Sequence, residues 1–285
     1  MKEWLMLDRA RAAAVLAVAV LGVSALAPHA TAGPATAVPT AAVEILPHRA
    51  LYKVTLDKAS SSSSIVDVQG RMGFEWRDAC DGWAVEQRYA MEFSRADGDG
   101  SVIQSTYSTW ESKDGDVYRF FVKRDRGGGE ERIEGKAVMP LPLGSGPGKV
   151  TFAEPEQQEL KLPKDTLFPT EHTIRMIQAA TSGKRFLRAP VFDGGEPEAP
   201  SLISAVLGKG RTDKLPSIKA EAAQGVYYPS RLAWFGPDSE GSEPDFEMSI
   251  DVLANGIARS ILVHYSDFSV RMSLEEVEAL PPPAC

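Results

Sequence analysis

The chain has 285 residues, and its 31 basic and 39 acidic side chains give a net charge of −8 at pH 7. This balance excludes the strongly basic composition of most nucleic-acid-binding proteins, so no nucleic-acid partner is expected. Such a charge favours solubility and says little about the fold.

The N-terminal segment resembles an export signal. Three basic residues precede an apolar run of 16 residues, Ala12 to Ala27, and Ala30-Thr31-Ala32 fits an A-x-A cleavage site. The run is shorter than the roughly 20 residues of a membrane-spanning helix, so a retained anchor is the weaker alternative. We predict a signal peptide at residues 1–32, cleaved near Ala32, and a product outside the cytoplasm that is not an integral membrane protein.

The two cysteines bear on the domain organisation. Cleavage would remove three basic and two acidic residues and leave 253 residues with a net charge of −9, enough for one large β domain or two average ones. Cys80 and Cys285 are the only cysteines, and a lone pair in an exported chain is most simply a disulfide. This bridge would enclose nearly all of the mature chain, which favours one domain at 48–285 after a flexible leader at 33–47.

The pattern from His48 onward is that of antiparallel strands. Polar and apolar residues alternate with period two, and turn residues recur every 8 to 12 positions. The sequence predicts 12 to 14 strands, among them 66–76, 83–93, 102–110, 117–123, 132–139, 186–192, 202–207 and 226–235. A last hairpin is expected around Asn255-Gly256, a pair that readily adopts the positive φ angles of a type I′ turn.

A single helix of consequence interrupts these strands. Thr170 is the expected N-cap, Glu171 places negative charge in the first turn, and Gly183 marks the end. The fold class is therefore all-β, a long curved antiparallel sheet with one main helix.

The sequence offers few groups for catalysis or metal binding. The histidines have no metal-ligand spacing, Asp97 to Ser108 lacks the glycine and glutamate of a calcium loop, and there is no Gly-x-Ser-x-Gly elbow. Glu86 and Glu92 could serve a glycosidase, but an exposed strand face gives the same pattern. We expect no enzyme, no catalytic residue, no metal and no cofactor.

Aromatic residues suggest a binding surface instead. A curved sheet can turn such side chains inward to line an apolar concavity, although ordinary core packing is the stronger interpretation. The sequence alone leaves open which of them face inward. The candidates are Phe74, Trp76, Trp83, Tyr89, Trp110, Tyr118, Phe120, Trp234 and Phe235.

Several segments together resemble the EipB family of periplasmic cell-envelope-integrity proteins of alphaproteobacteria. The resemblance runs from about His48 to Cys285, and Phe74 departs from it where tyrosine is expected. It rests on His48-Arg49-Ala50-Leu51-Tyr52, Gly70 to Trp76, Cys80-Asp81-Gly82-Trp83, Phe168 to His172, Phe192-Asp193-Gly194, Asn255-Gly256, Tyr265 to Phe268 and the terminal Pro-Pro-Pro-Ala-Cys.

The resemblance implies a β-spiral, similar to a half barrel of the lipoprotein carriers LolA and LolB, with the two cysteines paired. It implies a periplasmic location and a role in envelope maintenance and stress resistance, and brings no enzymatic activity or defined ligand. The expected partner is a lipid, a lipoprotein segment or a partner peptide on a concave apolar face. The alternatives are a module that pairs its sheet edge with another periplasmic protein, and an unrecognised hydrolase.

Overall fold

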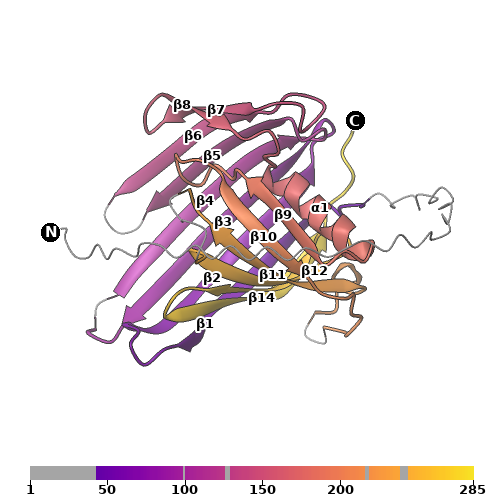
Figure 1. The fold of residues 1–285 in the computed structure, drawn as a ribbon. Coiled ribbons are helices and arrows are strands. Elements are labelled where there is room, and N and C mark those ends of the chain that lie inside the picture. Colours follow the sequence, from indigo (N-terminus) through magenta and orange to yellow (C-terminus); the bar gives the residue numbers. More distant parts are fainter. Residues whose placement is uncertain (1–42, 99, 126–128, 216–217, 238–242) are drawn as a thin grey trace, which may run out of the picture. The chain divides into compact units, whose positions relative to one another are not determined.

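Fourteen strands form one antiparallel sheet in the structure, a computed structural model that describes residues 43–285 except 99, 126–128, 216–217 and 238–242 (Figure 1). The first eight are β1 His48–Ala59, β2 Ile65–Asp78, β3 Gly82–Arg95, β4 Gly100–Ser112, β5 Val117–Asp125, β6 Glu130–Val138, β7 Gly148–Glu154 and β8 Gln158–Leu162. After the helix α1, Pro169–Thr181, come β9 Phe186–Val191, β10 Ser201–Leu207, β11 Tyr227–Phe235, β12 Phe246–Leu253, β13 Ala258–His264 and β14 Phe268–Ala279. A short 3₁₀ helix, η1 Glu221–Ala223, precedes β11. The predicted all-β class with one main helix is confirmed.

The first and last strands pair in the middle of the sheet. The strand order is β8-β7-β6-β5-β4-β3-β2-β1-β14-β13-β12-β11-β10-β9, so β1 joins two arms of consecutive hairpins. The β1–β14 ladder runs from His48 paired with Ala279 to Ala59 paired with Phe268. The two edges, β8 and β9, are consecutive strands of the chain, and the segment that connects them carries α1.

The sheet is rolled, because strands that are far apart in this order share one hydrophobic core. Trp76 of β2 packs in the same cluster as Ile203 of β10 and Ile177 of α1. Further along the same arm as β2, Phe152 of β7 packs with Phe192, which follows β9 of the other arm. The face of the sheet that carries these residues is called the inner face below.

The helix begins in a way that the sequence did not reveal. The structure contradicts Thr170 as the N-cap: the N-cap is Phe168, whose side chain caps nothing, and Pro169 occupies the first helical position. The side chain of Glu111, at the end of β4, instead accepts the N–H groups of Thr170 and Glu171, each at 2.8 Å. A carboxylate at this end also complements the helix dipole.

The end of the predicted leader that the structure describes packs against the domain: Ile45 is buried in the core, and the Leu46 N–H donates to the Asn255 carbonyl at 3.0 Å. The hairpin at Asn255-Gly256 is present, but only Gly256 has a positive φ, of 91°, so the turn is not type I′. The Asn255 side chain is used elsewhere, donating to the Ala222 carbonyl at 3.0 Å. The predicted signal peptide and its cleavage site lie outside the described residues.

Cys80 and Cys285 lie together, with their Sγ atoms 2.00 Å and their Cα atoms 5.9 Å apart. Cys80 is in the β2–β3 turn, and it is the non-glycine residue with a positive φ, 66°, among the described residues. Its N–H is held by the Asp78 carboxylate at 2.9 Å. Cys285 ends the segment after β14, where the Leu280 N–H donates to the Pro47 carbonyl. The pair spans 205 residues.

We expect that reduction of this pair lowers the free energy of unfolding by about 2 to 5 kcal/mol, because the unfolded chain then regains the entropy of an open loop. Urea unfolding with and without a reductant measures the difference. Cys80→Ser/Cys285→Ser is the matched control and should unfold like the reduced protein under both conditions. An unreduced protein no more stable than this variant would contradict the expectation.

Candidate functional site

The register of the strands decides which side chains point inward. In β2 and β3, Met72 lies opposite Tyr89 and Phe74 lies opposite Gln87, on the same face as the buried Trp76. Of the nine candidate aromatic residues, Trp110 and Phe235 lie on the outer face, next to Arg119 and Leu202 of the neighbouring strands. The inward ones are Phe74, Trp76, Trp83, Tyr89, Tyr118, Phe120 and Trp234.

Many apolar side chains on the inner face remain only half buried. Tyr89 stands edge-on to Tyr107 of β4, with ring centroids 6.5 Å apart, and Phe93 stands edge-on to Phe268 of β14 at 6.3 Å. These side chains, together called the apolar band, come from strands on both sides of β1 and β14. The apolar band consists of Phe74, Tyr89, Met91, Phe93, Ile103, Tyr107, Phe246, Met248, Ile261 and Phe268.

Two buried polar atoms lie beside this band. His48 and Trp76 are paired across β1 and β2, with ring centroids 6.3 Å apart. Among the described residues, neither His48 Nε2 nor Trp76 Nε1 has a hydrogen-bond partner. Burial lowers the pKa of His48, so its ring is neutral, and its Nδ1 donates to the Leu46 carbonyl at 2.7 Å, which leaves Nε2 able to accept one bond. An unpaired polar atom at such a place costs free energy, and a water molecule or a polar ligand group would relieve it.

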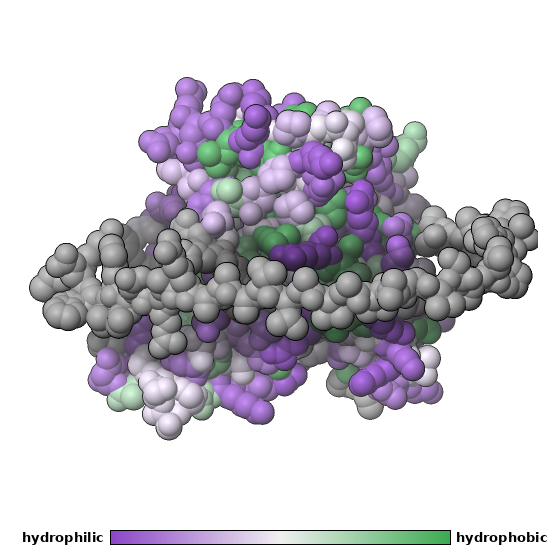
Figure 2. Space-filling view, viewed as in Figure 1, coloured by the Kyte–Doolittle hydropathy of each residue, from purple (hydrophilic) through white to green (hydrophobic). Residues whose placement is uncertain are grey.

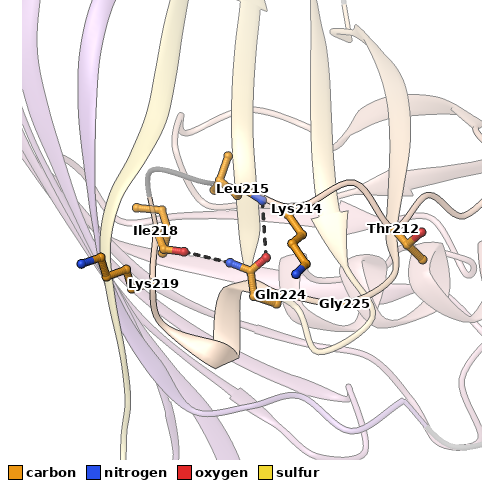
Figure 3. A pocket seen from close by; sticks show the side chains of 7 residues that line it. All are labelled: Thr212, Lys214, Leu215, Ile218, Lys219, Gln224 and Gly225. Atoms are coloured by element: carbon orange, nitrogen blue, oxygen red, sulfur yellow. Dashed lines mark hydrogen bonds between the residues drawn. The ribbon is translucent and has the colours of Figure 1, made fainter.

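A loop from β10 to β11 closes over one part of the inner face and holds a pocket of about 350 Å³ (Figure 3). Ile218 is buried in the core cluster and Leu215 packs against it. The Gln224 side chain holds the loop, accepting from the Leu215 N–H at 3.4 Å and donating to the Ile218 carbonyl at 2.8 Å. Lys214 and Lys219 also line the pocket and are exposed. The pocket thus combines an apolar floor with two cations, and nothing in the sequence marked it.

A larger hollow of about 820 Å³ lies over β4 to β7, on the outer face. Trp110 lies beneath the Arg119 guanidinium, 5.1 Å from it, and Phe121 lies nearby. Charged side chains such as Glu134 and Lys136 also line the hollow. Figure 2 likewise shows hydrophobic residues interleaved with hydrophilic ones on the face that it draws. This mixed lining suits an apolar ligand less well than the inner face does.

Two buried ionisable groups at the start of α1 have strongly shifted pKa values. Burial raises the pKa of Glu111 to about 7, although the two N–H groups that it accepts act in the opposite direction. Burial lowers the pKa of His172 to about 4, and its Nε2 has no partner among the described residues. Sequence reasoning identified neither residue as special, because their burial depends on contacts between β4 and the helix.

These shifts give opposite pH dependences. The pKa of Glu111 in the folded chain lies above its ordinary 4.5, so its contribution to the free energy of unfolding falls as pH rises from about 4.5 to about 7. The pKa of His172 lies below its ordinary 6.5, so its contribution grows as pH rises from about 4 to about 6.5. Each effect is worth up to about 3 kcal/mol.

We therefore expect Glu111→Gln to make the free energy of unfolding rise more steeply with pH between pH 4.5 and 6.5 than in the wild type. The substitution removes the group whose contribution falls with pH over this range. His172→Gln should do the reverse and make the slope of the free energy of unfolding against pH less positive than in the wild type. Urea unfolding at four or five pH values measures both slopes. Identical slopes in the two variants would contradict the assignment of the shifts.

The carboxylate pair that could have served a glycosidase does not form a site. Glu86 and Glu92 lie on the outer face of β3, six residues apart, which is about 20 Å along a strand. Glycosidases require a separation of about 5 to 10 Å. Glu86 is instead paired with Arg88. Among the described residues, no group of three or more His, Cys, Asp or Glu could hold a metal ion.

The sequence comparisons agree with this architecture. A sequence model described as EipB-like matches residues 39–281. The chain belongs to the EipB-like family. Among family-related proteins, the cell envelope integrity protein EipB of Brucella abortus (strain 2308) is 28% identical over 246 residues, which cover 83% of this chain and 85% of that protein.

A solved structure shows the same fold. It is the crystal structure of a beta-barrel-like protein of domain of unknown function DUF1849 from Brucella abortus, with a TM-score of 0.77 and 27% identity. The match covers 84% of this chain and all of that one. In the part of this family member that the structure describes, no helix is long and apolar enough to cross a membrane.

Proposed function

We propose that this chain is an exported periplasmic protein without enzymatic activity that maintains the integrity of the cell envelope. The family membership and the name of the Brucella relative support the envelope role. The composition of residues 1–32 supports export, and a disulfide between Cys80 and Cys285 suits an oxidising compartment.

Within this role, we assign to the inner face the binding of a lipid, or of a lipid-modified or apolar peptide segment. The observation that carries the proposal is the apolar band. Ten apolar side chains from opposite arms of the sheet line the inner face without being fully covered. An acyl chain laid along them would bury this surface, and each Å² of buried apolar surface contributes about 25 cal/mol to the free energy of binding.

The polar groups near the band fit the other end of an amphiphile. Lys214 and Lys219 flank the pocket whose floor includes Ile218, itself part of the core beneath the band. An anionic or zwitterionic headgroup placed there would meet two cations without leaving the apolar surface. His48 and Trp76 offer a second place for a polar atom.

Pairing of a partner strand with a sheet edge is less well supported. At the β9 edge, Pro190 has no N–H, and its carbonyl already accepts from the Leu167 N–H at 2.9 Å. The β8 edge is only five residues long. A partner strand would therefore find few free backbone groups.

Adjacent residues of β4 provide a test of the binding proposal. Ile103 points to the inner face opposite Met91, whereas Val102 points outward opposite Glu92 and is 51% exposed. We expect Ile103→Glu to weaken binding of a fluorescent fatty acid at least about tenfold, because a charge would lie under the acyl chain. Fluorescence titration measures the dissociation constants.

Val102→Glu is the matched control and should bind like the wild type. Equal affinity in Ile103→Glu and wild type would overturn the inner face as the binding site. Absence of binding in the wild type with fatty acids and with a lipopeptide would overturn the proposal itself.

A further inference from the structure

The outer face at the β9 end of the sheet carries an unusual number of apolar residues. Strand register places three rows of three side chains there: Phe186, Val206 and Arg231; Arg188, Ser204 and Ala233; Pro190, Leu202 and Phe235. Six of the nine are apolar, on the face opposite the core. Directly paired side chains in adjacent strands lie about 5 Å apart, so Phe186 and Val206 are neighbours, and Ala233 lies diagonally next to Val206. Pro190, Leu202 and Phe235 form a second apolar row, beyond Arg188 and Ser204.

One corner of this surface is strongly exposed. Phe186 is 74% exposed, more than any other large hydrophobic side chain among the described residues, and its cross-strand neighbour Val206 is 52% exposed. Phe186 follows the turn after α1, so it stands at the rim of the sheet rather than in its middle. Isolated exposed hydrophobic residues are common, but a directly paired Phe and Val with Ala233 diagonally next to them form a small patch.

Cations surround this corner although the chain as a whole is acidic. Lys184 and Arg188 lie two residues before and after Phe186, Arg231 is directly opposite Val206, and Lys209 follows the end of β10. Arg231 is paired with Glu247, at 2.6 Å between Nη2 and Oε2. Within the described part of the chain, no acidic side chain forms an ion pair with Lys184, Arg188 or Lys209.

We propose that this patch, Phe186 and Val206 within the ring of Lys184, Arg188 and Lys209, docks the protein on the surface of an anionic phospholipid bilayer. Phe186 and Val206 enter the boundary between headgroups and acyl chains, and the three unpaired cations meet lipid phosphates. Each such cation near an anionic surface strengthens binding about fivefold.

Charge complementarity favours an anionic bilayer over a second copy of the chain as the partner of this patch. A two-fold contact through the same corner would bring three unpaired cations of one copy close to three of the other. A bilayer with anionic lipid supplies the opposite charge over the whole patch. Because the patch is on the outer face, docking leaves the apolar band free, and the proposal does not depend on the function of the inner face.

Vesicle co-sedimentation tests the proposal. The probes are vesicles of phosphatidylcholine with one quarter phosphatidylglycerol, and vesicles of phosphatidylcholine alone, mixed at low salt with protein purified from the compartment in which it accumulates. We expect at least about tenfold tighter binding to the anionic vesicles, and a large loss of it at 0.5 M salt.

Two variants and one control separate the contributions. Phe186→Ser and Lys184→Glu/Arg188→Glu should each weaken binding to anionic vesicles at least about tenfold while the midpoint of thermal unfolding stays unchanged, because all three side chains are exposed. Val102→Ser removes a hydrophobic side chain of similar exposure to Val206, from a position opposite Glu92, and should bind like the wild type.

Equal binding to both vesicle types would overturn the proposal, as would wild-type binding by either patch variant. Dimers of the wild type that are lost in Phe186→Ser, without any vesicle binding, would assign the patch to a second copy instead.

Discussion

The pairing of β1 with β14 is the constraint on which the rest of this structure depends. The two strands that begin and end the folded chain are neighbours at the centre of the sheet, with all other strands arranged in two arms beside them. The backbone ladder is not the only link between the ends: the Tyr52 hydroxyl of β1 donates to the carbonyl of Ala258 in β13 at 2.8 Å, and Cys285 lies against Cys80. Separation of this pair would leave two independent meanders, neither of which could bury its inner face alone.

The central pair also explains why a helix lies inside an all-β fold. Because the chain leaves the centre along one arm and returns along the other, the segment between the two edge strands must cross the open side of the roll. α1 lies in that segment and packs on β9 and β10 through Ile177 and Ala180. Glu111 of β4 holds its first turn from the opposite arm. One helix is too little to fill the roll, and the apolar band is the surface that stays half covered.

Period-two alternation of polar and apolar residues was enough to predict the sheet, because each strand has one solvent-exposed face and one buried face. It also located the turns at Cys80 and at Asn255, and the single pair of cysteines predicted their contact. The sequence could not show that the Asn255 side chain donates a hydrogen bond to the Ala222 carbonyl, or that Ile45 is buried. Both facts depend on segments that come together only in the folded chain. The N-cap was missed for the same reason: Thr170 has the right side chain, but a carboxylate about 60 residues away occupies its place. The direction of each aromatic residue also required the register, since one shifted residue reverses the face.

Hydrogen exchange of the native protein, followed by mass spectrometry, tests the central pairing most directly. If β1 and β14 hold the two arms together, their amides can exchange only when the whole sheet unfolds, whereas those of the edge strands β8 and β9 exchange through local opening. The account predicts that peptides covering Tyr52–Thr55 and Arg271–Leu274 are the slowest in the chain. Faster exchange in these peptides than in β8 and β9 would contradict it.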